Sequence, residues 1–311
     1  MKKEDLRIVY MGTPDFAVEP LKRLVDNGFN VVAVVTMPDK PAGRGHHIQF
    51  SPVKRYAVER NIPVLQPERL KDEAWLEELR GYRADLQIVV AFRMLPEVVW
   101  GMPRMGTFNL HASLLPEYRG AAPINWAVIN GEKRTGVTTF FLQHEIDTGD
   151  IIMQRAIELT DEDNAGTVHD RLMDLGSDMV VETVERILAG DVKLSKQPDA
   201  VVKPAPKIFK ETCELHFDRD VKDVHNLVRG LSPYPGAWMT CGNGEVMKVF
   251  RTHVSEDDDA VAGKMESDGK RFLRVGCNGG WLYLDEVQMA GKRRMAIDEV
   301  LRGIHDITNL L

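Results

Sequence analysis

Three polar residues have side chains that could do chemistry together, namely Asn109, His111 and Asp147. The segment "TFNLH" alternates polar and apolar residues as a strand does, so Asn109 and His111 should project from one face. An amide on a buried strand face needs partners, because burying it without hydrogen bonds is costly. Asp147 stands in the turn "IDTGD" between two strand-like runs, where a loop carboxylate can face a cleft. A structural asparagine, a core histidine and a capping aspartate are the alternatives, and only the combination indicates a site.

An amide, an imidazole and a carboxylate fit acyl transfer to an external nucleophile. Asn109 would donate a hydrogen bond to an oxyanion, and His111 would move protons or stabilise charge. Asp147 would orient His111 and favour its charged form. A Ser-His-Asp hydrolase is the competing interpretation, because Ser113 lies near His111. No G-x-S-x-G motif surrounds Ser113, and Leu-Leu-Pro follows it, so we favour acyl transfer.

Alternating strand and helix patterns over the first half predict a doubly wound, mostly parallel sheet. Such sheets bind ligands at the carboxyl ends of their strands. A nicotinamide site is disfavoured, because only Gly12 stands where that fingerprint has three glycines. Ser51 and Pro52 predict a helix start. The expected strands are 6–12, 31–36, 85–92 and 107–111, and the expected helices are 13–28, 52–61 and 166–190, with another beginning near Ala122.

The later part of the chain has a different pattern. Prolines interrupt residues 191–207, which predicts a linker. Beyond it come one helical segment, "VKDVHNLVRGL", and the strand-like segments "GAWMTC", "EVMKVFRTHV", "KRFLRVGC" and "GGWLYLDEVQM". Several short strands with glycine turns predict a small β-barrel or sandwich.

Composition indicates a globular protein that is acidic overall. The 311 residues are 43% hydrophobic and 28% charged, with a net charge of −7, which argues against general affinity for nucleic acid but not against a local basic surface. No membrane span or signal peptide is evident, and three widely spaced cysteines lack metal or redox spacing, so we expect a cytoplasmic protein. Adjacent His46 and His47 are weak evidence for a metal, and we expect none.

The segment "FNLHASLLPEYRGAAPINWA" resembles the formyltransferases that use 10-formyltetrahydrofolate. The resemblance extends over nearly the whole chain, through "VYMGTPDFAVEPL", "TMPDKPAGRGHHIQFSPVK", "VVAFRMLP", "EIDTGD" and "RGLSPYPGAW". It implies the formyltransferase fold, with a Rossmann-like catalytic domain over 1–190, a linker over 191–207 and a tRNA-binding barrel resembling an OB-fold over 208–311.

The resemblance also implies roles for particular residues. Asn109, His111 and Asp147 match the catalytic positions of the family. The folate would lie against "SLLP" (Ser113, Leu114, Leu115 and Pro116) and on its pterin side against Phe92, Arg93, Met94 and Leu95. Many relatives have Ala-Tyr-Gly where this chain has Ala91-Phe92-Arg93.

The implied acceptor is the amino group of methionyl-initiator tRNA, and no metal is needed because the formyl group is already activated. The basic, glycine-rich segment 39–54 favours tRNA over an amino-sugar or nucleotide-sugar acceptor, which is the alternative. A nucleic-acid-binding module without catalysis is a second alternative, and the three catalytic-type residues argue against it. We expect Arg44 to contact the acceptor arm, the loop to order on binding, and the chain to act as a monomer. The expected tRNA contacts are Lys40, Arg44, Lys54, Lys203, Lys207 and Lys210, with Lys292, Arg293 and Arg294 as a further basic cluster.

Overall fold

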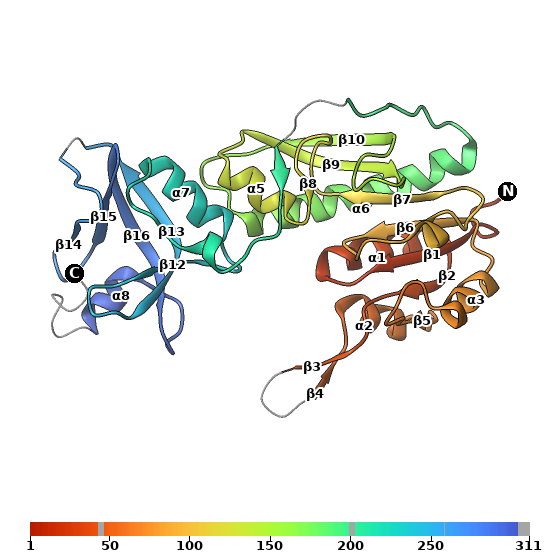
Figure 1. Ribbon diagram of the computed structural model, residues 1–311, viewed down its shortest axis with the longest axis horizontal. Coiled ribbons are helices and arrows are strands. Elements are labelled where there is room, and N and C mark those ends of the chain that lie inside the picture. Colours follow the sequence, from red (N-terminus) through yellow and green to blue (C-terminus); the bar gives the residue numbers. More distant parts are fainter. Residues whose placement is uncertain (43–46, 199–202, 258, 304–311) are drawn as a thin grey trace. The chain divides into compact units, whose positions relative to one another are not determined.

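The computed structural model describes the chain except residues 43–46, 199–202, 258 and 304–311 (Figure 1). The chain forms two compact units. The first unit comprises Met1–Gly120, Thr135–Ile157 and His169–Pro204. The second unit comprises Ala121–Arg134, Glu158–Val168 and Ala205–Leu311. Among the described residues, no helix combines the length and the apolar character needed to cross a membrane.

A seven-stranded sheet is the centre of the first unit, with the strand order β10-β9-β7-β6-β1-β2-β5. Neighbouring strands from β5 to β7 are parallel, and β9 pairs antiparallel with β7. This confirms the predicted mostly parallel sheet. The strands are β1 (Arg7–Gly12), β2 (Asn30–Val35), β5 (Val64–Leu65), β6 (Leu86–Val90), β7 (Thr107–His111), β9 (Arg134–Phe141) and β10 (Ile151–Glu158).

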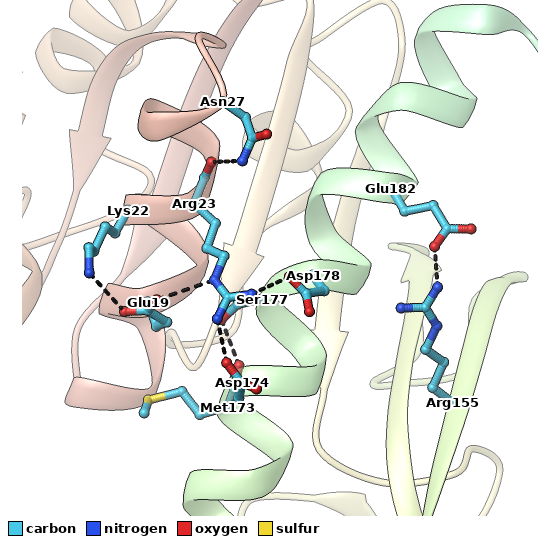
Figure 2. Close-up of polar contacts among 10 residues, drawn as sticks. All are labelled: Glu19, Lys22, Arg23, Asn27, Arg155, Met173, Asp174, Ser177, Asp178 and Glu182. Carbon is cyan, nitrogen blue, oxygen red and sulfur yellow. Dashed lines mark hydrogen bonds and ion pairs between the residues drawn. The ribbon is translucent and has the colours of Figure 1, made fainter.

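One face of this sheet is covered by α1 (Val18–Asp26) and α6 (Ala165–Ala189). Gly176 of α6 packs against Leu110 of β7 so closely that an added Cβ would lie 2.9 Å from a Leu110 methyl carbon. Arg23 joins the two helices, since its guanidinium contacts Glu19 of α1 and both Asp174 and Asp178 of α6 (Figure 2). The short 3-10 helix η1 (Asp15–Ala17) precedes α1, and Tyr10 of β1 donates a hydrogen bond of 2.7 Å to its last carbonyl, that of Ala17.

The other face packs against α3 (Glu73–Gly81) and α4 (Glu97–Trp100) through a cluster of buried aliphatic and tryptophan side chains.

The helix α2 (Pro52–Glu59) begins as predicted, because the Ser51 hydroxyl accepts a hydrogen bond of 3.1 Å from the Lys54 amide and Pro52 occupies the first turn. Helices therefore lie on both faces of the sheet, as expected for a doubly wound fold.

The carboxyl ends of β6 and β7 lie side by side, because Val90 pairs with Leu110 in the parallel register. The segments that follow these strands, 91–96 and 112–116, therefore leave the sheet at the same edge. Gly12 ends β1 next to them, and an added Cβ there would lie 2.7 Å from Ala17 Cβ and 2.9 Å from the Val90 carbonyl oxygen. Gly12 thus permits a close approach of strand and helix.

The segment between β2 and α2 differs from the irregular loop that the sequence predicted. Two short strands, β3 (Lys40–Ala42) and β4 (His47–Gln49), pair antiparallel in it. Strands of three residues leave too short an alternation to be recognised in the sequence. Arg44, on which the predicted tRNA contact centres, lies outside the described residues.

The second unit contains an antiparallel sheet of six strands with the order β12-β13-β16-β15-β14, and β17 pairs with β16. The helices α5 (Pro123–Ile129) and α7 (Val221–Gly230) pack together, since the Asn125 amide donates 2.8 Å to the Gly230 carbonyl. The antiparallel character agrees with the prediction, whereas closure into an OB-like barrel stays a prediction. The strands are β12 (Ala237–Thr240), β13 (Val246–Ser255), β14 (Met265–Ser267), β15 (Leu273–Cys277), β16 (Gly280–Met289) and β17 (Met295–Ala296), and α8 (Ile297–Arg302) follows.

All three cysteines of the chain are free thiols in the core of the second unit. Burial raises the pKa of Cys213, and burial followed by the nearby charge of Glu245 raises that of Cys241 to about 11. Burial, with Asp220 nearby, raises the pKa of Cys277 to about 12. These thiols therefore stay protonated and unreactive near neutral pH.

Candidate active site

His111 and Asp147 lie together in the first unit, at the carboxyl end of β7. Their closest atoms, His111 Nδ1 and Asp147 Oδ2, are 3.9 Å apart, and the two side chains are 7% and 11% exposed. The other ring nitrogen, His111 Nε2, lies 2.9 Å from the carbonyl oxygen of Tyr118. Because a carbonyl can only accept, Nε2 carries a proton and donates it there. A proton arriving at Nδ1 would face the Asp147 carboxylate.

Asp147 is held from two sides. Its Oδ2 accepts a hydrogen bond of 3.0 Å from the Gly120 amide. Its backbone is in the left-handed region, with φ of 56°, which costs energy for a residue with a Cβ and is tolerated best by aspartate and asparagine. The Gln197 side-chain amide donates to the carbonyl oxygens of Asp147 and Gly149, at 2.9 and 2.8 Å.

Asn109 lies on β7 two residues before His111, opposite Val89 of β6 and Phe140 of β9. Its Oδ1 atom is buried and has no hydrogen-bond partner among the described residues. A buried amide with an unpaired atom is destabilising unless water or a ligand completes it. The side chain of Asn109 therefore fits a site built for a polar substrate group.

The segment 112–116 is held rigidly against the sheet. Ser113 is fully buried, and its hydroxyl donates 2.6 Å to the Glu117 carbonyl. Thr138 of β9 donates to the Ser113 carbonyl at 2.7 Å and accepts from the Leu115 amide at 3.1 Å. Since its hydroxyl already binds backbone within its own turn, Ser113 is poorly placed as a nucleophile, and the hydrolase alternative loses support.

The segment 91–96 leaves β6 through Ala91, whose φ of 46° is also left-handed. Arg93 turns toward backbone, donating to the carbonyls of Pro67 and of Glu68, the latter at 2.9 Å, and burial lowers its pKa. Met94 is 72% exposed, while Leu95 is buried. The folate contacts predicted for Phe92, Arg93, Met94 and Leu95 stay predictions, and the Arg93 guanidinium already binds two carbonyls.

The predicted tRNA contacts have different surroundings. Lys54 forms an ion pair with Asp39 and a hydrogen bond of 2.8 Å to Gln66, and its side chain is only 14% exposed. Hydrogen bonds from Lys54 and Gln66 lower the pKa of Asp39. Lys40 lies in β3, and its tRNA contact stays a prediction, as do those of Arg44 and Lys54. Lys203, Lys207 and Lys210 are exposed.

In the further basic cluster, Arg293 pairs with Glu299 and Arg294 with Glu286. The described part of the chain contains no group of three or more histidine, cysteine or acidic side chains that could hold a metal ion. His46 lies outside the described residues.

Two matches to family models cover most of the chain. Residues 6–184 match the model described as formyl transferase, and residues 207–305 match the formyl transferase C-terminal domain. The chain belongs to the formyltransferase family.

Curated formyltransferases with high identity extend along the whole chain. A protein of Bacteroides thetaiotaomicron named methionyl-tRNA formyltransferase is 59% identical over 97% of this chain and 97% of its own. A protein of Parabacteroides distasonis with the same name is 57% identical over 99% and 98%. The solved N-formyltransferase of Helicobacter canadensis, in complex with folinic acid and dTDP-3-aminofucose, has a TM-score of 0.69 at 19% identity and covers 91% of this chain and 99% of its own. At that identity the likeness shows the fold alone.

Gln197, Tyr118 and Gly120 contact the candidate catalytic residues of this formyltransferase but were not predicted from the sequence. Tyr118 and Gly120 make these contacts through backbone atoms, so their side chains carry no sign of the contact. Gln197 stands in the proline-interrupted segment interpreted as a linker, where no periodicity marks a contact.

Proposed function

We propose that the protein transfers the formyl group of 10-formyltetrahydrofolate to the α-amino group of methionyl-initiator tRNA, giving N-formylmethionyl-tRNA for translation initiation. The observation that carries this proposal is the 59% identity, over 97% of both chains, to a protein named methionyl-tRNA formyltransferase. The sugar-modifying neighbour shares 19% of its sequence, so an amino-sugar acceptor is the weaker candidate.

The candidate site supplies the groups that such a transfer needs. The amine nitrogen forms a bond to the formyl carbon, and the bond from that carbon to N10 of the folate breaks, so the nitrogen loses a proton and N10 gains one. Asn109 donates from its side-chain Nδ2 to the oxyanion that develops on the formyl oxygen. Its buried Oδ1, which has no partner among the described residues, is an acceptor and takes no part in that bond. His111 accepts a proton at Nδ1, and Asp147 stabilises the resulting charge.

The substrates are held by separate parts of the chain. The folate lies against Ser113 to Pro116 and the segment after β6, at the edge where ligands bind in sheets of this kind. The tRNA contacts Arg44 and exposed lysines such as Lys207 and Lys210. We take the enzyme to act as a cytoplasmic monomer that needs no metal, with residues 1–190, 191–207 and 208–311 as its catalytic domain, linker and tRNA-binding domain.

Formylation by the purified protein tests this function. Methionyl-initiator tRNA, methionyl-elongator tRNA and a dTDP-amino sugar are each offered with 10-formyltetrahydrofolate, and the formylated products are quantified. We expect formylated product from initiator tRNA, little from elongator tRNA, and none from the sugar. Addition of a metal chelator should not change these yields, because the proposed reaction needs no metal. Formylation of the sugar in preference to the tRNA would replace the proposed function by the alternative one.

A further inference from the structure

The side chain of Gln197 makes four hydrogen bonds, two to the loop that carries Asp147 and two to Arg119. Its Nε2 donates to the carbonyls of Asp147 and Gly149, and its Oε1 accepts from Arg119 Nη2 at 2.7 Å and Nε at 3.2 Å. Both of its polar atoms are therefore used, and all the partners belong to the first unit.

The chain around Gln197 is itself fixed to the sheet. The backbone of Ser195 exchanges two hydrogen bonds with Ile151 at the start of β10, of 2.8 and 3.0 Å. Gln197 therefore lies only two residues from a backbone position that is hydrogen-bonded to β10. Its side chain extends from this anchored backbone to the loop that carries Asp147. A glutamine loses substantial rotamer entropy when held, and the fixed backbone reduces that cost.

The two carbonyls that Gln197 binds are that of a strained residue, Asp147, and that of Gly149 two residues later. Asp147 adopts a left-handed backbone, and Thr148 connects it to Gly149. An added Cβ at Gly149 would lie 1.7 Å from the Phe141 carbonyl oxygen, so the loop runs tight against the end of β9. A left-handed aspartate persists only where its surroundings over-determine it. Gln197 donates to the carbonyl of this residue and to that of Gly149, and so holds the chain that leaves Asp147.

The conformation of Asp147 determines its distance to His111. Its Oδ2 reaches both the Gly120 amide, at 3.0 Å, and His111 Nδ1, at 3.9 Å, from this backbone. A change of φ would move the carboxylate away from both. We propose that Gln197 is a positioning residue for formyl transfer, which keeps the Asp147 carboxylate beside His111 by clamping the carbonyls of Asp147 and Gly149.

The positioning role of Gln197 rests on the proposed function where it is tested by formyl-transfer kinetics. Its test by hydrogen exchange does not depend on that function. Gln197→Ala removes all four hydrogen bonds. Gln197→Glu keeps the acceptor for Arg119 and removes both donors. The matched control is Gln143→Ala, because Gln143 also donates into the same loop, 2.9 Å to the Thr148 hydroxyl, but binds neither carbonyl.

Kinetics of formyl transfer separate positioning from binding. We expect Gln197→Ala and Gln197→Glu each to lower kcat by roughly 10-fold or more with little change in the KM for 10-formyltetrahydrofolate, as for loss of an interaction needed in the transition state. Gln143→Ala should stay within about 2-fold of the parent. Gln197→Ala combined with Asp147→Asn should be no slower than Asp147→Asn alone, since the two act through one group. Parent-like activity of Gln197→Glu, or losses that add, would overturn the proposal.

Hydrogen exchange of the Gly120 amide tests the positioning role of Gln197 in the absence of any formyl-accepting substrate. This amide binds Asp147 Oδ2, so release of the loop in Gln197→Ala should speed its exchange by roughly 10-fold or more, while Gln143→Ala leaves it unchanged. Unchanged exchange in Gln197→Ala would refute the positioning role. If the parent protein formylated no tRNA but the exchange difference appeared, the proposed function would fail while the clamp stood.

Discussion

Asn109 combines a functional placement with an energetic cost. Its buried Oδ1 has no partner among the described residues, and an unpaired buried polar atom costs about 1–3 kcal/mol. Residues that are poor for stability and well placed for chemistry are common at active sites. Activity and stability should therefore respond in opposite directions when this side chain is removed.

We predict that Asn109→Ala lowers kcat for formyl transfer by roughly 100-fold or more, in line with other oxyanion donors. Folate binding should change little, and the melting temperature should stay the same or rise. Steady-state kinetics, folate titration and thermal unfolding measure the three quantities. Asn27→Ala, an exposed asparagine at the end of α1, serves as the control. Near-parental turnover would refute the oxyanion role.

The sequence carried part of this site and not the rest. The period of two placed Asn109 and His111 on one strand face, because a strand alternates regardless of its surroundings. The approach of Asp147 to His111 depends on how the loop after β9 turns, which is set by the Gly120 amide and by Gln197. Contacts between side chains and distant backbone leave no pattern in residue types, and that is why Gln197 was missed.

At the scale of elements, Arg23 is the ion-pair centre between α1 and α6 (Figure 2). Three carboxylates, those of Glu19, Asp174 and Asp178, converge on this one guanidinium. Its removal leaves like charges close together. Both helices also bury apolar residues against the sheet, so the ion pairs add to an interface that packing already forms.

Arg23→Ala should lower the free energy of unfolding by about 1 kcal/mol at low salt, the upper part of the range for exposed pairs. The difference should shrink in about 1 M NaCl, where the Debye length is about 3 Å. Urea unfolding at both salt concentrations gives the comparison. Lys22→Ala, which loses only a 3.7 Å contact to Glu19, is the control. A loss that does not depend on salt would assign the effect to packing of the Arg23 stem.

The helix α7 carries a half-buried histidine, His225, whose positively charged form is disfavoured by its surroundings. Burial, and then the positive charge of Arg229, lowers the pKa of His225 below its ordinary 6.5, and its Nδ1 lies 2.8 Å from the Thr252 hydroxyl. The unfolded chain takes up this proton near pH 6.5, before the folded chain does. His225 therefore costs no stability above that pH, and stability falls as the pH drops toward the lower folded-state pKa.

Replacing His225 should flatten this dependence. We expect the urea midpoint of the parent to fall from pH 7.5 to pH 5.5 by more than that of His225→Gln, whose side chain does not titrate. His216→Gln, with a histidine elsewhere in the second unit, is the control and should behave like the parent. Equal losses in the parent and His225→Gln would show that other groups set the acid sensitivity.

Most long elements were predicted, although the nine-residue helix α3 was not, and the shortest elements were missed. The strands β2 and β6 are continuous β-branched runs, and α6 repeats its apolar pattern over several helical turns. Patterns of that length are recognisable in the sequence. The strands β3, β4 and β17 have two or three residues each, and α8 is a six-residue helix. Tertiary pairing, not local preference, determines elements of that length.

For the whole molecule, the negative net charge opposes binding of tRNA, which is itself negatively charged. At −7 the chain repels nucleic acid on average, so tRNA affinity must come from local clusters. We expect Arg44→Ala to weaken tRNA binding and to lower the salt slope by about 0.7 to 0.9, the share of one phosphate contact. Binding titrations between low and moderate salt measure that slope. Lys71→Ala, an exposed lysine outside the proposed contacts, should match the parent. An unaltered slope in Arg44→Ala would exclude the loop from the tRNA interface.

The burial of every cysteine makes the native chain suitable for site-specific fluorescent labelling. Because Cys213, Cys241 and Cys277 are protonated and covered, a maleimide dye should find no reactive partner on the folded protein. A single cysteine introduced at exposed Lys207 would then take up the dye alone, with no need to replace the natural thiols. Changes in its emission would report docking of tRNA in real time, independently of catalysis.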